Sequence, residues 1–195
     1  MKTGCVILAA GAGRRMGGKN KAMLLWQGQT VLQRIADCLR TLGDVECVVV
    51  VAEPHASETE REANRLGVSC IRNPSPERGM GSSVALGFSY ASKHFAADAC
   101  WLWPVDAPGV DVATLKNVRD LAGVGKILTP RFGERGGHPT LVGREVWREL
   151  EACESESAGA RSVFRRDPSR RHFVEVDDPT VRHDIDEPTD LEALS

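Results

Sequence analysis

A near-continuous β-branched run at residues 45–51 is the feature that most limits what this chain can fold into. Such a run is typical of a strand that helices cover on both faces, as in a parallel sheet. Shorter apolar runs at residues 5–9 and 68–71 flank it, and segments of helical period at about 30–42 and 57–66 separate the three runs. Strands that alternate with helices in this way predict βαβαβ units, parallel strands and right-handed crossovers.

Composition narrows the function classes. The 195 residues are most simply one domain, and the hydrophobic and charged shares of 42% and 27% are those of a globular protein in water. A net charge of -2 offers no argument for nucleic-acid binding, and no segment is long enough to cross a membrane. Six scattered cysteines without a C-x-x-C pair disfavour a zinc site and suit a reducing cytosol. We therefore expect a cytoplasmic protein without membrane or nucleic-acid partners, whose oligomeric state is open.

The loop that follows the first apolar run is rich in glycine and in positive charge. Glycines let backbone N–H groups approach an anion, and arginine forks grip phosphate oxygens in pairs. A P-loop would need a hydroxyl where Asn20 stands, and a dinucleotide loop would need a third glycine where Met16 stands. The loop fits neither template, but its glycines and positive charges still predict phosphate binding. The candidate residues are Leu8, Ala9, Ala10, Gly11, Ala12, Gly13, Arg14, Arg15, Lys19 and Lys21.

Two further polar stretches follow predicted strands, where open α/β sheets bind ligands. Residues 73–83 end in Ser82 and Ser83, which we expect to open a helix, either by plain capping or at an anion site. Asp106 follows the apolar run at residues 100–105. Its carboxylate suits a ligand-bound cation, although turn formation before Pro108 is the competing explanation.

The last third of the chain adds three groups of candidates. Residues 126–130 read as a strand, and the loop after them carries Arg135 and His138. In residues 184–186 alternation places Asp184 and Asp186 on one side and Ile185 in the core, and paired carboxylates repel each other unless a cation or a donor lies between them. Five arginines lie close together in the sequence. They form either a solvated helix face or a group that helps to hold an anionic acceptor. They are Arg161, Arg165, Arg166, Arg170 and Arg171.

Five ordered segments resemble one family. The stretch L-A-A-G-A-G-R-R-M-G at residues 8–17 resembles the signature of nucleotidyltransferases that move a nucleoside monophosphate onto a phosphorylated acceptor. N-P and G-M-G-S-S within residues 73–83, P-V-D-A-P at 104–108, G-H-P at 137–139 and D-I-D-E-P-T-D-L at 184–191 are similar to segments of molybdenum cofactor cytidylyltransferases. The resemblance implies a glycosyltransferase-A-type fold: a single-domain α/β/α sandwich, spanning 1–195, with a mixed, mainly parallel sheet.

The resemblance also implies a reaction and roles. The reaction is Mg²⁺-dependent transfer of NMP, with CTP the favoured donor and molybdopterin the favoured acceptor, releasing pyrophosphate. Arg15 and Lys21 would hold the triphosphate, although Lys19 could take the place of Lys21. The metal would bind Asp106 and Asp186, with Asp184 as the second choice. The remaining assignments are Leu8, Ala9, Ala10, Gly11, Ala12, Gly13, Asn73, Gly81, Ser82 and Ser83 at the nucleotide, and Arg135 and His138 at the acceptor.

Other readings stay open. The same loop would serve a nucleotidyltransferase that uses GTP, or one that acts on a sugar phosphate or a terpenoid precursor. An NAD(P)-dependent oxidoreductase is supported by Gly11-Ala12-Gly13 and by Glu53 after the second strand, whereas Met16 and the long spacing to Glu53 count against it. A non-catalytic nucleotide-binding protein is the third alternative.

Overall fold

The computed structural model describes residues 1–11, 13, 16–43, 45–155, 158–186 and 190. Within them, eight strands form one sheet in the order β10-β7-β9-β6-β1-β4-β5, with β8 added to β7. Antiparallel pairing is confined to β9 and β8 in this sheet, and the other neighbours pair in parallel. The strands are β1 (Thr3–Ala9), β4 (Glu46–Val51), β5 (Ser69–Arg72), β6 (Ala99–Pro104), β7 (Ile127–Phe132), β8 (Arg135–Gly136), β9 (Thr140–Gly143) and β10 (Arg171–Glu175).

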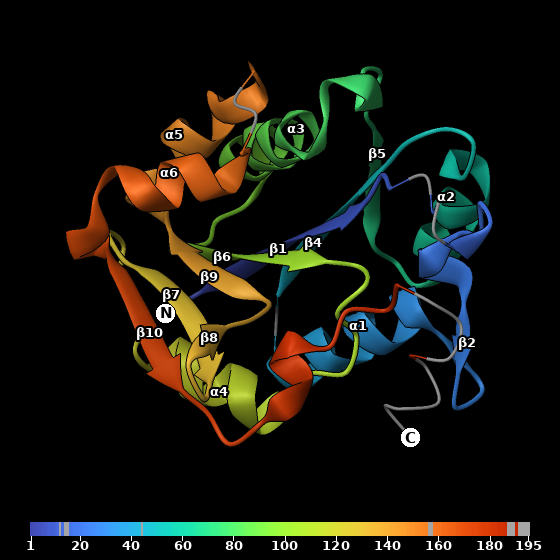
Figure 1. Ribbon diagram of the computed structural model, residues 1–195. Coiled ribbons are helices and arrows are strands. Elements are labelled where there is room, and N and C mark those ends of the chain that lie inside the picture. Colours follow the sequence, from blue (N-terminus) through green and yellow to red (C-terminus); the bar gives the residue numbers. More distant parts are fainter. Residues whose placement is uncertain (12, 14–15, 44, 156–157, 187–189, 191–195) are drawn as a thin grey trace.

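Helices cover both faces of the sheet (Figure 1). On one face lie α1 (Val31–Thr41), α2 (Ala56–Arg65) and α4 (Val112–Asp120). On the other lie α3 (Met80–His94), α5 (Trp147–Glu151) and α6 (Ala160–Arg166). Strand alternation explains the two cores, because Cys5 and Ile7 of β1 enter the first and Val6 and Leu8 the second. This confirms the predicted three-layer architecture and its mixed, mainly parallel sheet.

Short elements complete the chain. A two-stranded hairpin joins β2 (Leu25–Trp26) to β3 (Gln29–Thr30). Six 3₁₀ turns that lie wholly within the described residues are Lys21–Met23, Pro76–Arg78, Arg144–Val146, Cys153–Ser155, Pro168–Arg170 and Pro179–Arg182. No helix in the described part of the chain is long and apolar enough to cross a membrane.

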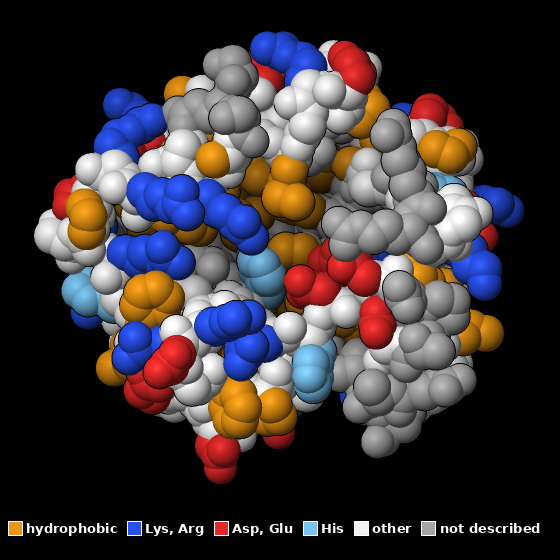
Figure 2. Space-filling model, in the orientation of Figure 1, with side chains coloured by type: hydrophobic (Ala, Val, Ile, Leu, Met, Phe, Trp, Pro, Cys, Tyr) orange, Lys and Arg blue, Asp and Glu red, His pale blue; other side chains and the backbone are white. Residues whose placement is uncertain are grey.

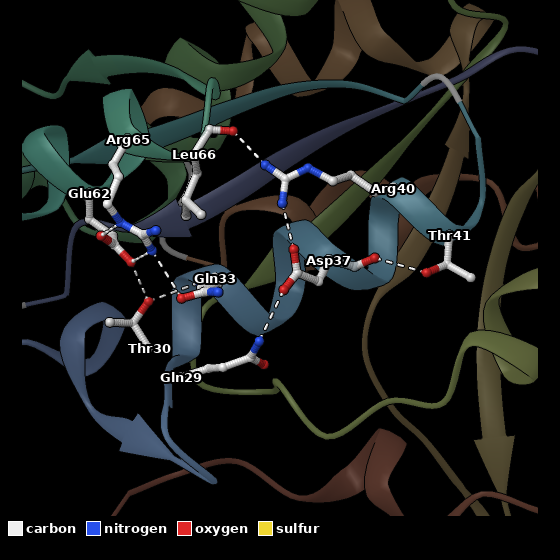
Figure 3. A network of polar contacts seen from close by, with 9 residues as sticks. All are labelled: Gln29, Thr30, Gln33, Asp37, Arg40, Thr41, Glu62, Arg65 and Leu66. Carbon is white, nitrogen blue, oxygen red and sulfur yellow. Dashed lines mark hydrogen bonds and ion pairs between the residues drawn. The ribbon is translucent and has the colours of Figure 1, made fainter.

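A dense polar network joins α1 to α2 (Figure 3). Thr30 caps α1 by accepting from the Gln33 amide at 3.1 Å and donates its hydroxyl to Glu62 at 2.6 Å. Arg65 donates to both oxygens of Glu62 at 2.8 Å, and Glu62 is only 8% exposed. These bonds, those from Arg65 first, lower the pKa of Glu62 although burial acts against them. Nearby, Arg40 joins Asp37 to the Leu66 carbonyl across the two helices.

The structure corrects one local prediction and confirms another. Ser82 and Ser83 do not open α3, which begins at Met80 with Gly79 as its N-cap at φ 87°. The Ser82 hydroxyl instead donates back to the Gly79 carbonyl at 2.8 Å, inside the first turn. Alternation at residues 184–186 correctly predicts a buried Ile185, but the segment pairs with no described strand. A backbone bond from the Ile185 amide to the Asp106 carbonyl at 2.7 Å and the buried Ile185 side chain help to fix its position.

Candidate functional site

The glycine loop leaves the carboxyl end of β1 and turns back on itself. The Gly13 carbonyl accepts from the Met16 and Gly18 amides at 2.8 and 2.9 Å, and Gly13 has φ 59°. A Cβ on Gly13 would lie 2.1 Å from the Lys19 carbonyl oxygen, so only glycine fits. Met16 is buried in the core and anchors the loop. The next α-helix begins only at Val31, whereas a dinucleotide loop opens a helix directly, which explains why methionine is accepted here.

The loop holds part of the predicted phosphate site. Leu8 and Ala9 are buried at the end of β1, Ala10 and Gly13 are half-buried, and Gly11 is exposed. Ala12, Arg14 and Arg15 lie outside the described residues, so their predicted roles stay predictions.

Asn20 fixes the residue that follows it. Its amide nitrogen donates to Glu58 at 2.9 Å and to Thr59 at 3.0 Å, both on α2. Its side-chain oxygen accepts from the Ala22 amide and caps the turn Lys21–Met23. Asn20 therefore positions Lys21 against the helix layer. Sequence reasoning saw Asn20 only as a missing hydroxyl, although an N-cap residue before a basic residue was the available signal.

Lys21 lies between two carboxylates that are 80 positions apart in the chain. Its Nζ is 3.2 Å from Asp106 Oδ2 and 3.0 Å from Asp186 Oδ1. Asp106 follows β6, the neighbour of β1, and the bond from Ile185 to the Asp106 carbonyl brings Asp186 alongside. Lys21 rather than Lys19 is thus the lysine that reaches both aspartates.

His138 and Asp184 belong to the same charged group. Burial raises the pKa of the Asp184 carboxyl, and the Asp106 carboxylate raises it further while His138 opposes the change. Burial lowers the pKa of His138 against the influence of Asp184 and Asp106. The Nδ1 atom of His138 is buried and has no hydrogen-bond partner in the described structure. Several acidic groups therefore face one another across a single lysine and a single histidine.

The donor set fits a hard divalent cation. Asp106 and Asp186 converge on one positive charge, and their side chains are 31% and 43% exposed, so their oxygens are open to a ligand. No cluster of three His, Cys, Asp or Glu side chains with metal-binding geometry occurs among the described residues. Mg²⁺ commonly binds through one or two carboxylates together with phosphate oxygens and water, which two aspartates beside a phosphate loop can satisfy.

A second group of predicted nucleotide-binding residues forms a buried, hydrogen-bonded cluster at the start of α3. The Asn73 amide nitrogen donates to Ser82 Oγ at 2.8 Å and to Ser83 Oγ at 2.9 Å, and its oxygen accepts from the Ser75 amide. All three side chains are at most 5% exposed, and Gly81 is buried, with its carbonyl accepting a hydrogen bond from Cys153 Sγ. In this arrangement the serine hydroxyls shape the loop at residues 74–81. Their predicted contact with a nucleotide stays a prediction.

The surface of this side of the molecule is divided by charge. Figure 2 shows lysine and arginine side chains over the α6 and β10 side, acidic side chains across from them, and a histidine between the two groups. Arg135 is exposed on β8, and no hydrogen bond or ion pair links it to Lys21 or its aspartates within the described structure. Its predicted acceptor contact is therefore untested.

Known proteins resemble this chain over most of its length. Residues 5–173 match the model of the MobA-like NTP transferase domain. The nicotine blue oxidoreductase of Paenarthrobacter nicotinovorans is 29% identical over 189 residues, which cover 93% of this chain and 90% of that protein. A probable molybdenum cofactor guanylyltransferase of Bacillus cytotoxicus is 30% identical over 113 residues, which cover 58% of this chain and 53% of that protein.

Solved structures share the fold. Rv0371c from Mycobacterium tuberculosis aligns with a TM-score of 0.80 at 27% identity and covers 100% of this chain and 97% of its own. A manganese complex of Rv0371c aligns with a TM-score of 0.76 at 24% identity, covering 100% of this chain and 98% of its own.

Proposed function

Because this chain belongs to the MobA-like NTP transferase domain family, a family of nucleotidyltransferases, we propose that it transfers NMP from an NTP to a phosphorylated acceptor and releases pyrophosphate. The observation that carries the proposal is the position of Lys21 Nζ between Asp106 and Asp186. Asp106 lies at the carboxyl end of β6, and Asp186 lies in the segment beside it. Both are next to the glycine loop that follows β1, the neighbour of β6.

The residues present are suited to positioning and to charge neutralisation. A divalent ion such as Mg²⁺, held by Asp106 and Asp186, would supply the positive charge that draws donor and acceptor phosphates together. The manganese complex of Rv0371c supports such an ion. Lys21 would hold the triphosphate with the backbone N–H groups of the glycine loop. An acceptor phosphate is already ionised near pH 7, so His138 is not required as a base.

For the donor we propose CTP. Ala9 ends β1 and Ala10 follows it at the start of the loop, where the Ala10 methyl group would narrow the slot for a base. The molybdenum cofactor guanylyltransferase supports GTP as the competing donor and molybdopterin as the acceptor. Calorimetric titration with each of the four NTPs in the presence of Mg²⁺ tests the donor. Tighter binding of GTP than of CTP would overturn CTP.

A pyrophosphate-release screen tests the reaction itself. Each NTP is incubated with Mg²⁺ or Mn²⁺ and with phosphorylated acceptors: molybdopterin, a sugar phosphate and a terpenoid phosphate. We expect release that needs NTP, metal and acceptor together. Metal-dependent NTP binding without release with any acceptor would favour the non-catalytic alternative.

The second candidate function is reduction or oxidation with a nicotinamide cofactor, because the nicotine blue oxidoreductase matches nearly the whole chain. Against it, the glycine loop leads into a 3₁₀ turn and a hairpin, with Met16 in the core, instead of opening a helix on the pyrophosphate. Titration of NADH followed by its fluorescence separates the two. Saturable binding of NADH that CTP does not displace would favour the oxidoreductase.

A further inference from the structure

The five arginines at residues 161–171 divide into two kinds. Arg166 and Arg170 form ion pairs with Glu149 of α5 at 3.3 and 2.6 Å, and Arg170 also pairs with Asp167. For Arg161, Arg165 and Arg171 the described structure contains no ion pair and no side-chain hydrogen bond. These three residues are called the open arginine cluster below.

The open arginine cluster is assembled by two elements. Arg161 and Arg165 are exposed and lie one turn apart on the same face of α6. Arg171 begins β10 and is half-buried, with its guanidinium 4.7 Å from the centre of the Phe173 ring. Arg171 Nε is buried without a partner, and burial together with the charges of Arg165 and Arg161 lowers the pKa of Arg171. Three positive charges thus gather at one place, and among the described residues no ion pair to an acidic side chain balances them.

This arrangement is costly without an anion. Like charges one helical turn apart are mildly destabilising, and an unsatisfied buried donor lowers stability further. An oxyanion would relieve both costs, because guanidinium forks bind phosphate and carboxylate oxygens in pairs. On the same surface, the Glu149 carboxylate balances the charges of Arg166 and Arg170 within the chain. The open arginine cluster has no such ion pair in the described structure.

The cluster lies beside the proposed reaction centre, on the side away from the glycine loop. The sheet order places β10, β7 and β9 on one side of β6, and β1 with its glycine loop on the other. Arg161 is within electrostatic reach of His138, because its charge lowers the pKa of His138, which Asp184 and Asp106 raise. Arg171 lies farther along the sheet, in register with Ile127 of β7. An NTP donor bound at the glycine loop, on the β1 side, would leave the open arginine cluster available to the acceptor.

We infer that the open arginine cluster is an anion-binding site that, on the proposed function, receives a second oxyanion of the acceptor, remote from the phosphate that is nucleotidylated. The acceptor class is therefore an extended molecule with at least two anionic groups. One group meets the Asp106–Asp186 centre, and the other, a phosphate or a carboxylate, meets Arg161, Arg165 and Arg171.

Titration of inorganic phosphate, followed by calorimetry, tests the site with the full chain. CTP and Mg²⁺ are present at saturation, so that the donor and metal positions are filled. The variant Arg161→Gln/Arg165→Gln changes only exposed side chains, and Arg171→Lys keeps the charge but removes the fork. Arg148→Gln on α5 is the matched control, an exposed arginine outside the cluster. Thermal melting of each variant confirms folding.

We expect phosphate to bind wild type and the control equally, the double variant at least tenfold more weakly, and Arg171→Lys to an intermediate degree. Unchanged binding in the double variant would overturn the site. The titration is repeated without CTP and Mg²⁺. Arginine-dependent phosphate binding that is seen only there, and is lost at saturating CTP, would also overturn the inference, because the cluster would then serve the donor. Arginine-dependent phosphate binding in a chain that binds no NTP would support the anion site while refuting the proposed nucleotidyl transfer.

Discussion

Two polar regions of this molecule use charge in opposite ways. Between α1 and α2, Glu62 accepts from Arg65 and Thr30, and Arg40 joins Asp37 to the Leu66 carbonyl (Figure 3). At the carboxyl ends of β1 and β6, Asp106, Asp184 and Asp186 share Lys21 and His138. The open arginine cluster lies beyond them, on the side where Figure 2 shows lysine and arginine side chains gathered over α6 and β10.

The difference separates stability from function. A network whose members are all paired gains free energy within the chain itself. Like charges held together lower stability and are retained where a ligand supplies the missing charge. Substitutions should therefore have opposite signatures: in the α1–α2 network they weaken the fold, and at the acidic centre they weaken binding and turnover.

Asp106→Asn should have the largest effect. Loss of one of two carboxylates that face a shared cation is expected to lower metal-dependent pyrophosphate release about 10²–10³-fold. It should also weaken Mn²⁺ binding measured by calorimetry, which reports on the metal independently of turnover. The free energy of unfolding should be nearly unchanged, because relief of repulsion among the neighbouring carboxylates offsets the loss of the Lys21–Asp106 ion pair.

Asp120→Asn, an exposed change on α4, is the matched control for charge and should leave both readouts unaltered. Wild-type Mn²⁺ binding in Asp106→Asn would remove this residue from the metal site. A clear loss of stability would instead make the acidic centre a structural element like the α1–α2 network.

Glu62→Gln tests the opposite region. It exchanges charge-assisted hydrogen bonds from Arg65 for weaker ones and should lower the free energy of unfolding by about 2 kcal/mol at pH 7 in urea denaturation. NTP affinity should not change. The exposed control Glu77→Gln should stay within about 0.5 kcal/mol of wild type.

The effect of Glu62→Gln should depend on pH in a fixed direction. The pKa of Glu62 is lowered in the fold, so its stabilising contribution is complete above the ordinary glutamate pKa and is lost as pH falls through the lowered value. Wild type and variant should therefore converge in stability in acid. A difference that grows on acidification would contradict the assigned ion pair.

Asn20→Ala should have the smallest effect on stability. Asn20 links the two regions, because it bonds to α2 and directly precedes Lys21 of the acidic centre. It removes the cap of the turn Lys21–Met23 and the bonds to Glu58 and Thr59, at a cost of about 1 kcal/mol. Because Lys21 loses its support, pyrophosphate release should fall about tenfold with a raised KM for the NTP. Asn117→Ala, exposed on α4, serves as control. A stability change without a change in KM would limit Asn20 to a structural role.

Local patterns predicted most of the architecture. The apolar runs became β1, β4, β5, β6 and β7, and the segments of helical period at about 30–42 and 57–66 became α1 and α2. Elements without a strong period were not predicted: the β2–β3 hairpin, β8 and the short helix α5. Their positions depend on tertiary packing, which propensity over a few residues cannot report.

The candidate site shows the same limit. Asp106 and Asp186 were each singled out from their own surroundings, and the structure places both at Lys21. No local pattern could choose between Lys19 and Lys21, because the choice depends on the hydrogen bonds from Asn20 to α2. Nor could spacing alone separate the paired Arg166 and Arg170 from the open arginine cluster, since Glu149 comes from another helix.

The segment at residues 179–186 is attached to the sheet edge-on, through few bonds. The Val181 carbonyl accepts from the His138 amide, the Ile185 amide donates to Asp106, and Gly137 packs so closely on Val181 that a Cβ would lie 2.0 Å from its oxygen. Detachment of this segment would withdraw Asp186 and expose Val181 and Ile185, which are fully buried in the core beneath α1 and α4, while the core on the other face of the sheet would stay in place. Opening of so small a unit demands less energy than global unfolding, so catalytic competence in this architecture is more fragile than the fold that carries it.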